Sequence, residues 1–272
     1  MASPLVVLTD FFAVTNRALS YAAALALPLK AELVLLHVRH NTLLSPDDYS
    51  RATPVSQHKT DQALQKLAAD QPVPTQVDVS EEFLPDAVKE AVRRHHPLLL
   101  VMGRPGSATA PEELLTSTAM DLLRNAPYPL LVIPAAGWDA FPPRRLLLAV
   151  DGEPFQLAQH QDVLRQLLAA TQGTLDIVRV MDDEHSRLGA VAVLETVREN
   201  DLRDLLPENR LHEVYHPEVV AGVLQEASRQ EADLLVVVAR NHSVLGGLFH
   251  SSVTAQILRD SPIPVLVLPA ED

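Results

Sequence analysis

A glycine-containing turn followed by hydroxyl side chains is the part of this sequence best suited to bind an anion. Gly103 and Gly106 directly follow the apolar run LLLVM. A Gly-x-x-Gly turn after a strand lets backbone amides approach a negative group, because no Cβ lies in the way. After a gap of nine residues, Thr116–Thr118 open a predicted helix, whose free N–H groups and dipole favour phosphate. Taken alone, the same residues also fit a tight turn and a helix cap.

Short apolar strands that alternate with amphipathic helices must position this turn. Most of the strands are continuous apolar runs, which is typical of parallel strands buried on both faces. The alternation predicts a doubly wound sheet, which binds ligands beyond the carboxyl ends of its strands. The run TQVDVS alternates in polarity and is expected at an edge. The predicted strands of the first half are 4–9, 32–38, 75–80, 98–102 and 129–133, and the predicted helices are 16–28, 56–69, 85–95 and 116–125.

The second half of the chain repeats the first. Four landmarks recur in one order: PLVVLTD as RRLLLAVD, AELVLLHV as GTLDIVRV, HPLLLVMG as ADLLVVVA, and TSTAMDLLRNAPYPLLVIP as SSVTAQILRDSPIPVLVLP. Between the copies, AAGWDAFPP contains Gly and two prolines and is interpreted as the linker. We therefore predict two domains, at residues 1–137 and 138–272.

The order strand–Asp, strand–Val, Gly-x-x-Gly, nine residues, and a small-residue–Ser pair opening a helix resembles the universal stress protein family, twice over along nearly the whole chain. The resemblance implies two tandem doubly wound α/β domains, each a five-stranded parallel sheet with helices on both faces. It further implies a pseudo-two-fold pair, formed inside one chain by strands 129–134 and 264–269. Both strands are apolar and bounded by prolines, so an unpaired edge there would be a liability.

In ATP-binding members of this family, an acid after the first strand faces the adenine and ribose. Carried over residue by residue, Asp10 with its neighbour Thr9 takes that place, the main chain of Val38 touches the base, Met102 and Gly103 lie beside the ribose, and Gly106, Ser117 and Thr118 hold the phosphates. Arg104 either makes a charge-assisted contact to phosphate or is a solvated arginine. Thr116 departs from the family, because it stands where the motif has glycine and its Cβ could crowd a phosphate.

The second copy keeps less of this motif. Asp151 and Val180 remain at the adenine end, but Ala239 and His242 replace the two glycines of the turn, and the following gap is one residue shorter. No ATP bound in the family's usual manner is expected there. Ser251 or Ser252 is expected to cap the last helix.

Composition excludes several other classes of function. The chain has 272 residues and no cysteine, so disulfides, thiolate metal sites and a cysteine nucleophile are ruled out. Its net charge of −13, without a basic patch, argues against nucleic acid as a partner. No apolar run approaches the roughly 20 residues that span a bilayer, and a cytoplasmic protein without a membrane segment is expected. The cluster Asp182–His185 could hold a divalent ion, but a solvated acidic loop is the commoner case, so no metal is predicted.

The resemblance to the universal stress protein family leads to one main expectation about function. We expect a stress-linked, non-enzymatic regulatory protein that binds ATP or a related adenine nucleotide in its first domain. The alternative is a protein-interaction module of the same fold whose nucleotide sites have decayed. A slow ATPase or autophosphorylating enzyme is a weaker third option, since no Ser/His/Asp set or carboxylate pair is recognisable. Which protein partners it has, and whether it forms a homodimer, stay open.

Overall fold

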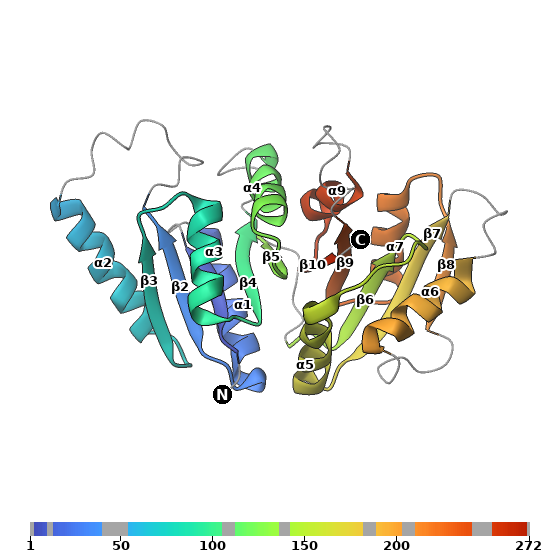
Figure 1. Cartoon of the computed structure of the whole chain (residues 1–272), viewed down its shortest axis with the longest axis horizontal. Helices are drawn as coiled ribbons and strands as arrows, with labels where there is room; N and C mark the ends of the chain where they lie inside the picture. Colours follow the sequence, from blue (N-terminus) through green and yellow to red (C-terminus); the bar gives the residue numbers. More distant parts are fainter. Residues whose placement is uncertain are drawn as a thin grey trace.

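The computed structural model describes residues 3–9, 13–39, 54–104, 112–135, 142–181, 189–202, 210–240 and 252–270. Strands and helices alternate along both halves (Figure 1). The first half contains β1 (Leu5–Thr9), α1 (Ala13–Leu29), β2 (Leu33–Val38), α2 (Pro54–Ala69), β3 (Thr75–Ser80), α3 (Leu84–His95), β4 (Leu99–Arg104), α4 (Glu112–Asn125) and β5 (Leu130–Pro134). The second contains β6 (Arg145–Val150), η2 (Ala158–His160), α5 (Gln161–Thr171), β7 (Thr174–Met181), α6 (Gly189–Val197), η3 (Arg198–Leu202), β8 (Leu211–Tyr215), α7 (Val219–Arg229), β9 (Leu234–Arg240), α9 (Val253–Asp260) and β10 (Val265–Ala270).

All ten strands form one sheet, in the order β3-β2-β1-β4-β5-β10-β9-β6-β7-β8. Neighbouring strands are parallel within each half, whereas β5 and β10 are antiparallel where the halves meet. At this seam Leu131 is the register partner of Leu266, and Val132 that of Val265. The predicted fold is confirmed: two five-stranded parallel sheets paired through their last strands.

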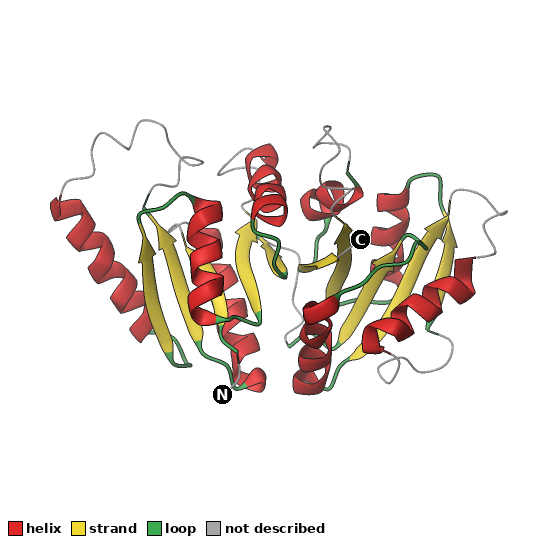
Figure 2. Ribbon diagram, viewed as in Figure 1, coloured by secondary structure: helices red, strands yellow, loops and turns green. Residues whose placement is uncertain are grey.

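Helices cover both faces of the sheet (Figure 2). One face carries α1, α5 and α6, which bury residues such as Leu25 and Leu167. The other face carries α3, α4, α7 and α9, which bury residues such as Val88 and Ile257. Because the central strands are apolar on both sides, each of these two cores runs without interruption through both halves. Strand β3 lies at the edge and is only half-buried, as its alternating sequence predicts.

Contacts beside the seam also join the two halves. Helix α1 of the first half packs against α5 of the second, and α4 packs against α9. The ring of Tyr128 meets that of His160 edge-on, with centroids 5.5 Å apart. The halves therefore share a core and side-chain contacts as well as a strand pair. The predicted boundary between residues 137 and 138 falls in 136–141, which lies outside the described residues.

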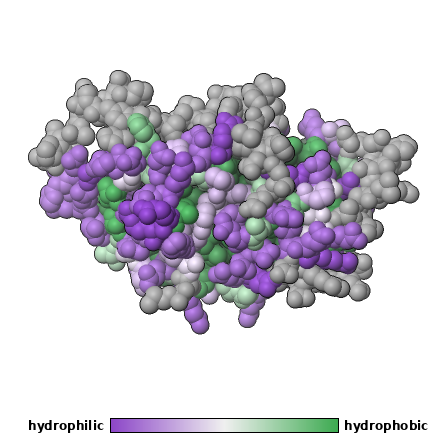
Figure 3. Space-filling view, in the orientation of Figure 1, coloured by the Kyte–Doolittle hydropathy of each residue, from purple (hydrophilic) through white to green (hydrophobic). Residues whose placement is uncertain are grey.

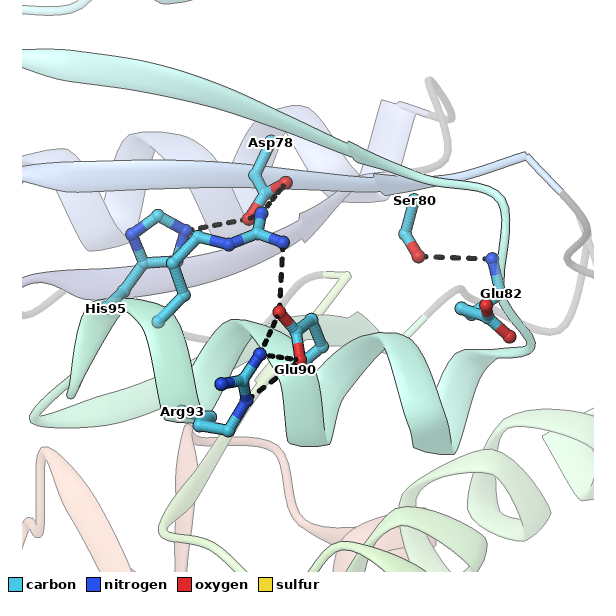
Figure 4. Close-up of polar contacts among 7 residues, drawn as sticks. Asp78, Ser80, Glu82, Glu90, Arg93 and His95 are labelled. Atoms are coloured by element: carbon cyan, nitrogen blue, oxygen red, sulfur yellow. Dashed lines mark hydrogen bonds and ion pairs between the residues drawn. The ribbon is translucent and has the colours of Figure 1, made fainter.

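A polar network fixes α3 on the edge strand β3. His95 and Asp78 point toward each other from the two elements, with Nε2 and Oδ2 2.7 Å apart (Figure 4). Arg94 donates to both oxygens of Asp78, at 2.8 and 2.9 Å, and also to Glu90. Arg93 in turn pairs with Glu90. This network replaces the apolar packing that an edge strand lacks.

On the face shown in Figure 3, hydrophilic residues cover most of the described surface, and apolar residues show only in small patches. Among the helices of the described residues, none combines the length and the apolar character needed to cross a membrane.

Candidate ligand sites at the carboxyl ends of the strands

In the first domain, the sheet order reverses beside β1. This strand lies between β2 and β4, so the crossovers leave it in opposite directions. In open α/β sheets such a reversal leaves a crevice beyond the carboxyl end of the strand. Thr9 ends β1 there and is buried, with 6% of its surface exposed. Its Oγ1 has no hydrogen-bond partner within the described part of the chain, while its carbonyl lies 3.1 Å from Nδ1 of His37. A buried hydroxyl thus stands at the crevice.

The neighbouring strand ends supply apolar and backbone surface. Val38 and Met102 are both buried at 6% exposure, and Gly103 follows Met102 in β4. Two predicted site residues, Asp10 and Gly106, lie outside the described residues. The structure therefore places Thr9, Val38, Met102 and Gly103 at the carboxyl ends of three neighbouring strands, and their role in ligand binding stays a prediction.

Arg39, which the sequence analysis did not single out, ties the outer edge of this crevice together. It donates to Asp61 of α2 at 2.9 Å and to Glu81 at 2.6 Å. The hydrogen bond with Asp61 is the main reason that the pKa of Arg39 is raised. Asp61 and Glu81 lie far from Arg39 in the sequence, so no local motif indicated this contact.

Arg104 does not point into solvent. Its Nη1 donates to the carbonyls of Leu258 and Arg259, at 2.6 and 2.5 Å, and its Nη2 donates to that of Ser261, at 2.8 Å. These carbonyls lie at the C-terminal end of α9, where free acceptors and the negative end of the dipole attract a cation. Arg104 therefore joins the turn of the first domain to a helix of the second. The interpretation as a solvated arginine was wrong, and the predicted phosphate contact stays a prediction.

The helix after the turn starts earlier than predicted. The structure begins α4 at Glu112 rather than at residue 116, so Thr116 and Ser117 lie beyond its first turn. The sequence at this start, Glu112–Leu115, consists of good helix formers. Thr118 is buried, with 6% of its surface exposed. The phosphate role assigned to Thr116, Ser117 and Thr118 stays a prediction.

The second domain has a cavity of about 990 Å³ at the corresponding place. It lies at the carboxyl ends of β6, β7 and β9, between the first residues of α7 and α9. Most of its lining is apolar. The residues are Ala149, Val150, Asp151, Glu153, Pro154, Phe155, Val180, Val219, Val223, Val237, Val238, Arg240, Ser252, Val253, Thr254 and Ile257.

One polar cluster closes an edge of this cavity. Arg240 donates to Asp151 at 2.8 Å and to the backbone carbonyl of Glu153 at 2.7 Å, and it also pairs with the Glu153 carboxylate. The Glu153 N–H donates to Asp151 Oδ1 at 3.1 Å, which forms a tight turn around Gly152. Gly152 has φ +95°, and a Cβ there would lie 2.7 Å from Nε of Arg179. Glycine is therefore required for this turn.

Two further predictions concern the second domain. Ser252 is the N-cap of α9, and its Oγ accepts a hydrogen bond from the Ala255 N–H at 3.1 Å, which confirms the predicted cap. The acidic cluster Asp182–His185 lies outside the described residues. Across the ranges that the structure describes, no three His, Asp or Glu side chains are grouped so that they could hold a metal ion.

Comparisons with known proteins support the fold. The sequence model of the "Universal stress protein family" matches residues 1–134 and 143–269. A universal stress protein from Archaeoglobus fulgidus DSM 4304 has 16% identity and a TM-score of 0.69, covering 100% of this chain and 98% of its own. A functionally unknown protein from Pseudomonas aeruginosa PAO1 has 16% identity and a TM-score of 0.59, covering 99% and 93%. The cytoplasmic domain of a prokaryotic cation chloride cotransporter has 10% identity and a TM-score of 0.53, covering 98% and 95%. No curated relative matches the sequence.

Proposed function

Because the chain belongs to the universal stress protein family, we propose that it is a stress-linked regulator that binds ATP or a related adenine nucleotide in its first domain. The observation that carries this proposal is the position of Gly103, the first glycine of the Gly-x-x-Gly pattern. Gly103 is the last residue but one of β4, which pairs with β1 at the point where the strand order reverses. Open α/β sheets bind their ligands at such a point.

The described residues suit the two ends of a nucleotide differently. Val38 and Met102 offer buried apolar surface for a base, and the buried Oγ1 of Thr9 offers a polar group for a ribose or base. The glycine pattern that begins at Gly103 is expected from its sequence to offer backbone amides for phosphate. Binding through backbone amides needs no catalytic side chain, and we propose no enzymatic activity.

The second candidate is an interaction module of the same fold without a nucleotide. It is favoured by Arg104, whose guanidinium is hydrogen bonded to α9 instead of being directed at a phosphate. The presence of Thr116 in place of the motif's glycine also favours this second candidate. Under this reading the turn serves the contact between the domains.

Mass spectrometry of the small molecules released when freshly purified protein is denatured tests the nucleotide proposal. Calorimetry with ATP then locates the site through three variants. Gly106→Val is expected to abolish binding, because its side chain fills the turn. His242→Ala, the matched change in the second domain, is expected to leave binding unchanged. Thr116→Gly is expected to strengthen binding, because it removes the Cβ beside the phosphates.

Two results would contradict the proposal. If Gly106→Val binds ATP as well as the parent does, the first domain is not the site. If the parent releases and binds no nucleotide, while Thr116→Gly gains binding, the interaction module is favoured, since the pocket would survive without its ligand.

A further inference from the structure

The cavity of the second domain has an apolar interior and an acidic edge. We propose that it binds an amphipathic amine, meaning an organic cation with an apolar body. The ammonium group pairs with the carboxylates of Asp151 and Glu153, and the apolar body lies against the valines of the cavity. This site is separate from the proposed nucleotide site and takes a ligand of opposite charge.

The apolar body of the ligand is indicated by the walls and by the rim. Five valines, from β6, β7, β9 and α7, line the interior together with Phe155 and Ile257. At the rim, Val219 and Val253 are exposed at 39% and 41%, although both are large apolar residues. A seated apolar group would remove these side chains from water, which is favourable by about 25 cal/mol per Å² of apolar surface buried. A cavity of about 990 Å³ has room for such a group.

The charge of the ligand is indicated by the polar cluster. Asp151, Glu153 and Arg240 are the charged residues in the described lining, so the lining carries one excess negative charge. The Arg240 side chain is 14% exposed and is held by both acids, whereas those of Asp151 and Glu153 are 65% and 77% exposed. An ammonium can therefore reach carboxylate oxygens from solvent. An anion would have to compete with two carboxylates for Arg240.

The charges around the cavity do not cancel the excess negative charge of its described lining. Behind Gly152, Arg179 is paired with Glu213 at 3.3 Å, so this neighbouring pair is neutral. The N-termini of α7 and α9 also lie at this edge and would by themselves attract an anion. Ser252 already accepts a hydrogen bond from the first turn of α9. Glu218 is the N-cap residue of α7 and makes no side-chain hydrogen bond to that helix, but it is a further acid near the edge of the cavity.

The acidic edge is a built feature of the second domain alone. It depends on the sequence Asp151-Gly152-Glu153, in which the positive φ of Gly152 turns both acids toward Arg240. The first domain has Asp10-Phe11-Phe12 after the matching strand, with neither the glycine nor the second acid. The sequence of the first repeat at this place therefore lacks two of the three residues that make the acidic edge.

Three probes that share one apolar body and differ in the head group test this proposal: octylammonium, octanoate and octanol. Each is titrated into the full-length protein by calorimetry below the concentration at which it aggregates. We expect octylammonium to bind at least tenfold more tightly than octanoate, with octanol between them. We expect the double variant D151N/E153Q to lose at least tenfold of the octylammonium affinity and little of the octanol affinity.

A matched control separates this site from the overall negative charge. The double variant E82Q/D86N removes two exposed acids from the first domain and is expected to bind octylammonium like the parent. Circular dichroism establishes that each variant is folded. The proposal is overturned if octanoate binds as tightly as octylammonium, if D151N/E153Q keeps the parent's octylammonium affinity, or if the control loses as much. Gly106→Val is expected to leave octylammonium binding unchanged. The amine proposal can therefore hold even if the nucleotide proposal fails.

Discussion

Arg104 and Arg240 occupy the same position in the two copies, and they do different things. Each is the last residue of the strand that follows the sheet's switch point, β4 in one half and β9 in the other. Arg104 crosses to the other domain and caps the C-terminal carbonyls of α9. Arg240 stays within its own domain and pairs with Asp151 and Glu153 beside the cavity.

This difference shows how a duplicated scaffold can divide its work. The sheet, its helices and the seam are nearly symmetric, because apolar burial sets them and both copies keep the apolar pattern. The strand ends carry few apolar contacts, so single substitutions there change partners without disturbing the sheet. One copy has kept the glycine turn, and the other has gained an acidic edge.

The largest expected effect is at the seam, where the two copies are most alike. Leu131 and Leu266 are register partners, exposed at 1% and 0%. Replacing either with alanine is expected to cost about 3 kcal/mol of unfolding free energy, because each leaves a cavity in a shared core. Urea denaturation followed by circular dichroism measures this cost. Both variants are expected to unfold in one transition.

Two separate transitions, with only one of them shifted by each variant, would show that the halves fold independently. The two copies would then be independently folding domains joined by a linker, and not two parts of one core.

A smaller effect is expected from the matched arginines. Arg104→Ala removes three hydrogen bonds from a charged donor to partly buried carbonyls, and we expect it to cost about 2 kcal/mol. Arg240→Ala breaks ion pairs with two well-exposed acids, and we expect a cost below about 1 kcal/mol. Urea denaturation gives both values. Hydrogen exchange is expected to quicken in the last turn of α9 only for Arg104→Ala.

Equal costs for the two arginines, or unchanged exchange in α9, would remove the asymmetry on which the comparison rests. Arg104→Lys sharpens the result. It keeps the charge but lacks the planar fork that reaches three carbonyls, so an intermediate cost is expected.

Sequence patterns were sufficient for the sheet and insufficient for the polar contacts. Continuous apolar runs located the strands to within about two residues, and the alternating run TQVDVS located the edge strand β3. The bonds of Arg104 to α9 span more than half of the chain, and those of Arg240 to Asp151 join strand ends far apart in sequence. Periodicity reports burial, which is local, while these pairings depend on the folded arrangement. The start of α4 was placed four residues too late, because the hydroxyl residues Thr116–Thr118 resemble a helix cap although the helix already begins at Glu112.

The smallest expected effect compares Glu226 with Glu90, which hold matching places on α7 and α3. Each pairs with an arginine three residues later, but the side chains are 4% and 38% exposed. The hydrogen bond from Arg229 is the main reason that the pKa of Glu226 lies below its ordinary value of 4.5, and Gln230 and His212 add to it. The pKa of Glu90 is lowered by Arg93 in the same way.

Below the ordinary pKa, the unfolded chain takes up a proton on Glu226 while the folded chain still holds the carboxylate. The free energy of unfolding therefore decreases as the pH is lowered. The contribution of Glu226 is therefore complete above that value and is lost as the pH drops through the lowered one. Glu226→Gln is expected to cost about 1 kcal/mol near pH 7 and progressively less as the pH drops through the lowered pKa, whereas Glu90→Gln, exposed to water, is expected to change little at any pH. Urea midpoints across this range measure both variants. If Glu90→Gln shows the larger pH dependence, burial does not explain how the two glutamates differ in their effect on stability. The explanation would then have to lie in the His95–Asp78 network around Glu90.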